Sequence, residues 1–211
     1  MNPRINDQEK LSYIGISLSP TSTTESAAAI LDKNLKIITL DKLFSMQDVQ
    51  YFLDNLPGKR NSIVLVSIPE NETLISSKWK YNSRCYQAVN LNSPIKNTDN
   101  WADRFSTRGC EYFEELKNGG ADIFRFDIDN IKKSMGYFAP FKHRTPTDCK
   151  SIQNTLKMKF GMREIPSNML PVSQLEAILG ACLARTIANG KENEDYKKLY
   201  QYCNLDVLGF C

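Results

Sequence analysis

YIGISLSP, Tyr13 to Pro20, and SIVLVSIP, Ser62 to Pro69, are the two short apolar runs that decide the fold of this chain. Each run has the length of one strand, is rich in isoleucine or valine and closes at a proline, which predicts a strand buried inside a sheet. Ser17 and Ser67 hold matching places near the ends of these strands. The two serines therefore mark the ends of two strands that are expected to lie inside one sheet.

The residues after the first run predict an antiparallel hairpin. Ser26 to Leu31 and Leu35 to Leu40 are separated by only three polar residues, Asp32 to Asn34, which suit a tight turn. With Leu11 to Leu18, these strands are expected to form a three-stranded meander.

A helix is predicted between the meander and the second apolar run. Ser45 is suited to cap this helix, and Asp48 supplies an acidic capping partner three residues later. Apolar residues recur at helical spacing from Val49 to Leu56, and Pro57-Gly58 ends the helix. Because a helix connects the strands on either side of it, we expect the fourth strand to run parallel to its neighbour.

The rest of the chain predicts one insertion, one strand and several helices. Residues 69–107 contain both tryptophans but no strong periodicity, which favours an insertion. A fifth strand is expected from Asp122 to Asp127. Helices are expected over 108–117, from Asp129 to about Met135, from Thr147-Asp148 to about Phe160, from Pro171 to Asn189 and from Glu192 to Tyr202.

These elements predict an α/β fold. We expect a mixed five-stranded sheet of order 3-2-1-4-5, with the second strand antiparallel and helices on both faces. The chain is expected to be a single domain over residues 1–211, with an insertion at about 69–107 and extra C-terminal helices. Its 211 residues suffice for one substantial core.

Composition narrows the class of protein. The chain is 41% hydrophobic and 24% charged, and it has no apolar run near the roughly 20 residues of a membrane helix, which predicts no membrane partner. Its polar beginning, MNPRINDQEK, favours a cytoplasmic location. The six cysteines form no CxxC pair, so reduced and partly buried thiols are expected.

The net charge of +3 is mild, but its distribution is uneven. Between Ser134 and Arg163 the chain has six basic residues and one acid. This bias indicates either a solvated helix face or a surface for nucleic-acid phosphates. The candidate nucleic-acid-binding residues are Lys142, His143, Arg144, Lys150 and Lys157.

Four stretches resemble parts of the ribonuclease H-like superfamily, and in particular a family of predicted nucleases akin to the RuvC-type resolvases. They are YIGISLSP (Tyr13 to Pro20), VLVSIPEN (Val64 to Asn71), FRFDID (Phe124 to Asp129) and LPVSQLEAILGACLA (Leu170 to Ala184). The resemblance leaves the insertion unmatched. It implies the sheet described above, a Gly-x-Asp in the first strand, an acid ending the fourth strand and an acid near the start of a late helix.

The acids implied by the resemblance hold Mg²⁺ or Mn²⁺ for phosphodiester hydrolysis, because hard divalent cations need clustered carboxylate oxygens. In this chain, however, the Gly-x-Asp reads Gly15-Ile16-Ser17, and Ser67 stands where the fourth strand should end in an acid. The late helix keeps Glu176, which the resemblance makes the candidate metal ligand. Glu70 and Asp127 are further acids that could reach the same site.

Three functions remain open at this point. The chain is expected to be a catalytically degenerate member of the predicted-nuclease family that binds nucleic acid or a protein partner and needs no cofactor. Alternatively, it is an active metal-dependent nuclease, with Glu176, Glu70 and Asp127 holding Mg²⁺ or Mn²⁺. The third alternative is a scaffold that contacts a protein partner through the insertion at about 69–107.

Overall fold

A computed structural model describes residues 12–18, 25–44, 46–56, 62–67, 117–118, 122–136, 145–190, 192–202 and 205–211. The insertion predicted at 69–107 and almost all of the helix predicted at 108–117 lie outside these ranges. The elements, in chain order, are β1 (Ser12–Ser17), β2 (Ser26–Leu31), β3 (Ile37–Leu43), α1 (Met46–Asp54), β4 (Ser62–Ser67), β5 (Asp122–Phe126), α5 (Ile128–Ser134), α6 (Pro146–Phe160), α7 (Val172–Asn189), β6 (Tyr196–Tyr202) and β7 (Leu205–Phe210).

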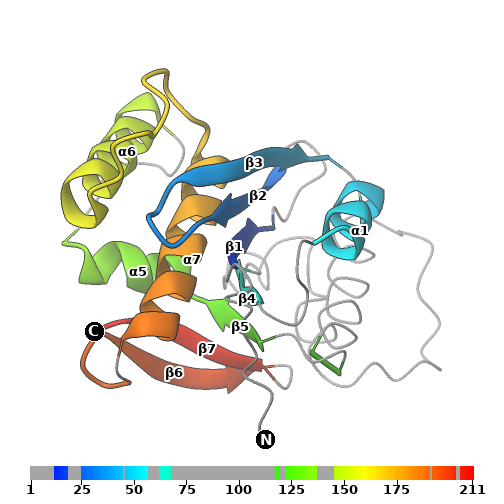
Figure 1. The fold of residues 1–211 in the computed structure, drawn as a ribbon. Helices are drawn as coiled ribbons and strands as arrows, with labels where there is room; N and C mark the ends of the chain where they lie inside the picture. Colours follow the sequence, from blue (N-terminus) through cyan, green and yellow to red (C-terminus); the bar gives the residue numbers. More distant parts are fainter. Residues whose placement is uncertain are drawn as a thin grey trace, which may run out of the picture.

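The strands form one sheet of order β3-β2-β1-β4-β5-β7-β6 (Figure 1). The predicted order of the first five strands is present, and β2 is antiparallel to both β1 and β3. β4 runs parallel to β1 and β5 runs parallel to β4, as a helical crossover requires. The prediction of five strands is wrong, because the hairpin of β6 and β7 extends the sheet beyond β5.

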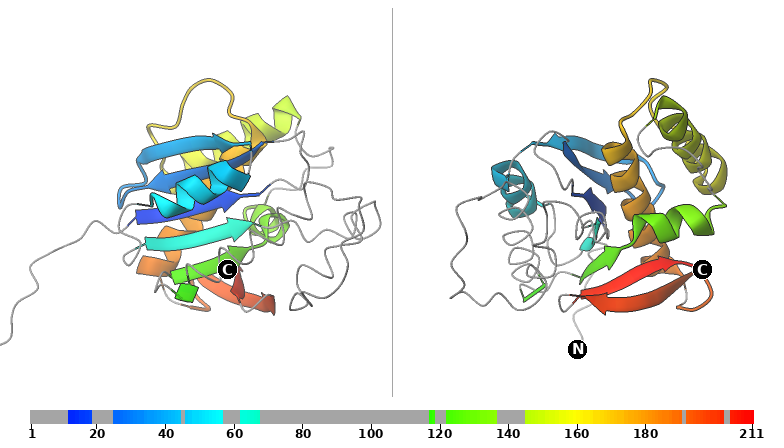
Figure 2. Two further views of the ribbon diagram at one scale, coloured as in Figure 1. Left: turned by 90° about the vertical axis from the view of Figure 1, so that its right-hand side faces the viewer. Right: turned by 180° about the vertical axis from the view of Figure 1, so that it is seen from behind.

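Helices cover both faces of the sheet, as predicted (Figures 1 and 2). Alternation along the central strands divides their side chains between two cores. Tyr13 of β1 and Leu65 of β4 face the core that contains α7, whereas Ile14 and Val64 face the core that contains α1. The alternating pattern therefore explains why strands that read as continuous apolar runs are buried on both faces.

The prediction of a helix from Glu192 to Tyr202 is wrong. Residues Tyr196–Tyr202 form strand β6, which pairs antiparallel with β7 over Leu205–Phe210. The tyrosines and leucine of β6 also fit a helical spacing, but the β-rich run of β7 gives them a partner strand. Pairing with the adjoining strand overrides local propensity in this segment.

Two predicted helix starts also move by a few residues. Asp127 caps α5, which begins at Ile128 and not at Asp129, because its Oδ1 accepts a hydrogen bond of 3.1 Å from the amide of Asn130. α6 is capped by Thr145, whose Oγ1 accepts a hydrogen bond of 3.1 Å from the amide of Asp148. The end of α6 at Gly161, with φ of 65°, is a left-handed cap.

α7 is the helix that fixes the candidate site to the sheet. Its apolar side chains are buried, and the burial continues around most of the helix from Val172 to Ala184. Among the described residues, no helix combines the length and the apolar character needed to cross a membrane.

Candidate functional site

The ends of β1 and β4 bring the two predicted serines together. Ser17 pairs with Ser67 in the parallel register of the strands. The amide of Leu18 continues this pairing, because it donates a hydrogen bond of 3.0 Å to the carbonyl oxygen of Ser67. Both serines are buried. The two strand ends that were expected to form the site therefore lie side by side, and their side chains carry neutral hydroxyl groups.

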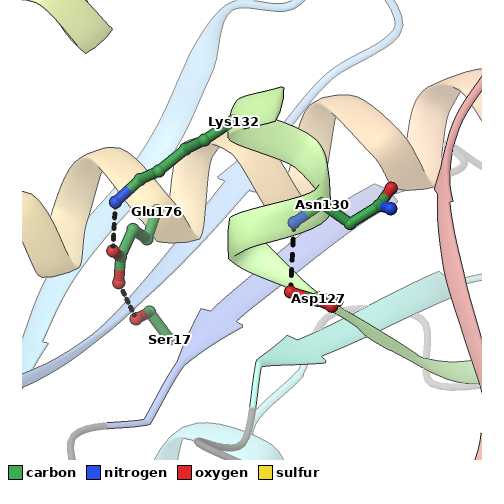
Figure 3. Close-up of polar contacts among 5 residues, drawn as sticks. All are labelled: Ser17, Asp127, Asn130, Lys132 and Glu176. Carbon is green, nitrogen blue, oxygen red and sulfur yellow. Dashed lines mark hydrogen bonds and ion pairs between the residues drawn. The ribbon is translucent and has the colours of Figure 1, made fainter. Parts of the chain in front are cut away.

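Glu176 of α7 lies against the end of β1. The Oγ of Ser17 donates a hydrogen bond of 2.9 Å to Oε2 of Glu176 (Figure 3). α7 can come so close because Gly15 of β1 has no side chain: a Cβ there would overlap the backbone of α7. The contact between Ser17 and Glu176 joins two of the three positions that the family resemblance implied.

Lys132 of α5 completes the cluster, and sequence analysis missed it. Its Nζ lies 3.2 Å from Oε1 of Glu176, and the exposed fractions of the two side chains are only 7% and 17%. Figure 3 shows the lysine reaching from α5 toward α7, so that Glu176 is held from two sides. We refer to Ser17, Lys132 and Glu176 as the Glu176 cluster.

The spacing of apolar residues in α5 could have revealed Lys132. Ile128, Ile131 and Met135 recur at intervals of three and four residues and mark one face of the helix. Lys132 follows Ile128 by four residues and falls on that face. Because a lysine is rarely buried without a partner, its position on an apolar face predicts an acidic partner in the core.

Asp127, at the end of β5, has a different role from Glu176. Its carboxylate accepts a hydrogen bond from the amide of Asn130 and so stabilises the first turn of α5. In Figure 3 this carboxylate lies at the start of α5, apart from the contact between Ser17 and Glu176. Asp127 is therefore not a member of the Glu176 cluster.

The described residues do not fit a divalent-metal centre. Such a centre needs several carboxylate oxygens at one point, but no three His, Cys, Asp or Glu side chains gather in the described part of the chain. Both oxygens of Glu176 already accept hydrogen bonds, and the Lys132 ammonium would repel an incoming cation. Glu70, the remaining predicted ligand, lies outside the described residues.

Only two of the five predicted nucleic-acid-binding residues lie in the described ranges. Lys142, His143 and Arg144 lie outside the described ranges, whereas Lys150 and Lys157 are exposed on α6. These two lysines are seven residues apart and therefore share one face of the helix.

Two thiols in the core are poor nucleophiles. Burial raises the pKa of the Cys182 thiol to about 12, and its Sγ lies 3.9 Å from the Sδ of Met162. Burial, followed by the neighbouring Asp148 carboxylate, also raises the pKa of Cys149. Because the thiolate is the reactive form, neither thiol is suited to covalent catalysis. The expectation of buried cysteines is confirmed for these two residues.

Comparison with known proteins does not add a family to this description: no family model, no curated protein and no solved structure matches the chain. Two features of the described residues bear on function, namely the Glu176 cluster and the exposed lysines of α6.

Proposed function

We propose that the chain is a catalytically degenerate domain of the ribonuclease H-like type, which binds nucleic acid without cleaving it. The observation that carries the proposal is the ion pair between Lys132 and Glu176. The family resemblance implies that a glutamate in this position would hold a divalent cation in an active nuclease. In this chain, an ammonium group of the protein itself fills that role.

The ion pair resists replacement by a metal ion. Both side chains are largely withdrawn from water, so a cation that displaced Lys132 would leave a buried ammonium without its partner. Breaking a buried pair in this way costs about 3–5 kcal/mol. Ser17 and Ser67 would offer the incoming metal only neutral oxygen atoms. This chemistry disfavours the alternative of an active nuclease, as does the hydrogen bond of Asp127 to the start of α5.

A nucleic-acid partner is supported by the charge of α6. Its lysines, Lys150, Lys157 and Lys159, are all exposed, while its one acid, Asp148, is buried. The exposed charges of the helix are therefore positive, which suits contact with phosphate groups. The alternative protein partner was predicted to bind at 69–107, outside the described residues, so no described contact supports it.

A combined cleavage and binding assay tests the proposal. Purified protein is incubated with labelled DNA, RNA and hybrid duplexes in Mg²⁺ or Mn²⁺, and binding is measured in parallel by fluorescence anisotropy at several salt concentrations. We expect no cleavage, together with binding that weakens steeply as salt rises.

The variant Glu176→Gln, purified in the same way, is the control for contaminating nucleases. Cleavage by the wild-type protein that disappears both with EDTA and in Glu176→Gln would establish an active nuclease. Absence of salt-sensitive binding to every nucleic acid would refute the binding role.

A further inference from the structure

The turn between β2 and β3 is a rigid, positively charged projection. Oδ1 of Asp32 accepts hydrogen bonds from the amides of Asn34, at 2.8 Å, and Lys36, at 2.9 Å. Leu35 adopts a positive φ of 61° and is buried in the core, which anchors the turn from inside. Lys33 and Lys36 are exposed on either side of this anchor. Both ammonium groups are therefore presented to solvent from a fixed backbone.

Two contacts attach this turn to distant parts of the chain. Nε of Arg185 in α7 donates a hydrogen bond of 3.0 Å to the carbonyl oxygen of Lys33. Nζ of Lys36 lies 3.0 Å from Oε2 of Glu164, in the segment that leaves α6. In Figures 1 and 2 the turn accordingly lies between α7 and the chain that follows α6. Three segments far apart in sequence thus meet at one surface.

The chain that leads to Glu164 is rich in basic residues. Glu164 is preceded closely by the exposed residues Arg163, Lys159 and Lys157. The acids on this surface are Asp32, whose carboxylate binds the turn backbone, and Glu164, whose pair with Lys36 is exposed by 60% and 63%. An exposed pair of this kind is weak, so Lys36 can exchange Glu164 for another anion at little cost.

We propose that this surface binds the phosphate backbone of nucleic acid, and we call it the turn–helix surface. It rests on the proposed nucleic-acid binding, and it adds residues that no sequence pattern connects to α6. The turn–helix surface consists of Lys33, Lys36, Lys159, Arg163 and Arg185. Lysines contact phosphates as point charges, and arginines add a planar set of donors. Such contacts track the backbone and do not read the base sequence.

The test compares two double variants that remove the same charge from opposite edges of the sheet. The first variant is Lys33→Gln/Lys36→Gln. Lys33 has no ion pair among the described residues, and Lys36 is in the exposed pair with Glu164. Lys197→Gln/Lys198→Gln on β6 matches it, because Lys198 pairs with Asp206 at 2.6 Å and its side chain is 45% exposed. Affinity for labelled single- and double-stranded DNA and RNA is measured by anisotropy over a range of salt concentrations. Circular dichroism confirms that both variants are folded.

We expect Lys33→Gln/Lys36→Gln to weaken binding about tenfold and to reduce the slope of log affinity against log salt by about two, because two phosphate contacts are lost. The β6 variant should remain within about twofold of the wild-type affinity, as its lysines lie away from the backbone track. Equal losses in the two variants would refute the turn–helix surface and indicate attraction by net charge alone.

Two further outcomes separate the inference from the proposed function. If the wild-type protein binds nucleic acid and the turn variant binds equally well, the turn–helix surface is refuted while the proposed function stands. If the wild-type protein binds vesicles containing phosphatidylserine but no nucleic acid, both are refuted, because the positive surface then serves a lipid headgroup.

Discussion

Gly15 of β1 lies directly against Gly180 of α7: a Cβ added to Gly180 would stand 3.3 Å from the Cα of Gly15. On the other side of this contact, a Cβ on Gly15 would overlap the backbone carbonyl of Ala177. The helix therefore touches the strand backbone itself. Glu176 lies one helical turn before Gly180, and Ser17 lies two residues after Gly15, so the same contact brings Glu176 onto Ser17.

The first prediction concerns these two glycines. Gly15→Ala should lower the free energy of unfolding by about 3 kcal/mol or more, because the new methyl group meets helix backbone that cannot move away. Gly180→Ala should cost less, about 1–2 kcal/mol, because its methyl group meets the side chain of Phe126 and alanine favours the helix. Urea denaturation followed by circular dichroism measures both values. The reverse order would contradict the close approach of α7 to β1.

The second prediction concerns the buried ion pair. Lys132→Met should lower the free energy of unfolding by about 3 kcal/mol, because Glu176 is left as a largely buried charge without its cation. Lys133→Met, at the exposed neighbouring position, is the matched control and should change stability by less than about 0.5 kcal/mol. Adding Glu176→Met to Lys132→Met should recover most of the loss. Additive losses in the double variant would show that the two side chains are not coupled.

The third prediction concerns metal binding. Millimolar Mn²⁺ should leave the melting temperature of the wild-type protein unchanged, because Lys132 holds the one acid of the cluster. The double variant Ser17→Asp/Lys132→Gln removes the ammonium and adds a second carboxylate next to Glu176. Mn²⁺ should raise its melting temperature, since a ligand that binds only the folded state stabilises it.

Lys132→Gln alone is the control for this experiment, and it should respond less than the double variant. Stabilisation of the wild-type protein by Mn²⁺, lost in Glu176→Gln, would mean that Glu176 is a metal ligand after all.

The fourth prediction concerns alkaline pH. Burial raises the pKa of the Cys182 thiol from 9.0 to about 12 in the folded protein, so the folded state keeps its proton where the unfolded state has lost it. The resulting stability is present below pH 9 and is lost between pH 9 and pH 12. Over this range, wild-type stability relative to Cys182→Ala should fall by up to about 1.4 kcal/mol per pH unit. Cys211→Ala, at an exposed thiol, should follow the wild-type curve.

The central sheet was predictable because its signals are local and agree with one another. The apolar runs at Tyr13 and Ser62, the polar turn at Asp32 and the amphipathic pattern after Asp48 each predict one element, and their order leaves few topologies. The β6–β7 hairpin was missed for the opposite reason. A helical spacing of tyrosines and leucine competes there with strand pairing, and only the partner strand decides between them.

The Glu176 cluster was predictable only in part. Sequence reasoning placed Ser17 and Glu176 in one site, since both hold positions that the family resemblance marks. It missed Lys132, because the resemblance supplied only acids to look for, and a cation in an acidic site is the departure from that pattern. The spacing of Ile128 and Ile131 carried the missing information, since it puts Lys132 on a buried face.

The small residues beneath α7 have a consequence for ancestry. Gly15, Ala27, Ala29 and Gly180 are all in this contact or in the core beside it. Any descendant that keeps the helix this close to the sheet must keep residues of this size, whereas Lys132 and Glu176 can change only together. Distant relatives of this chain should therefore share its spacing of glycine and alanine.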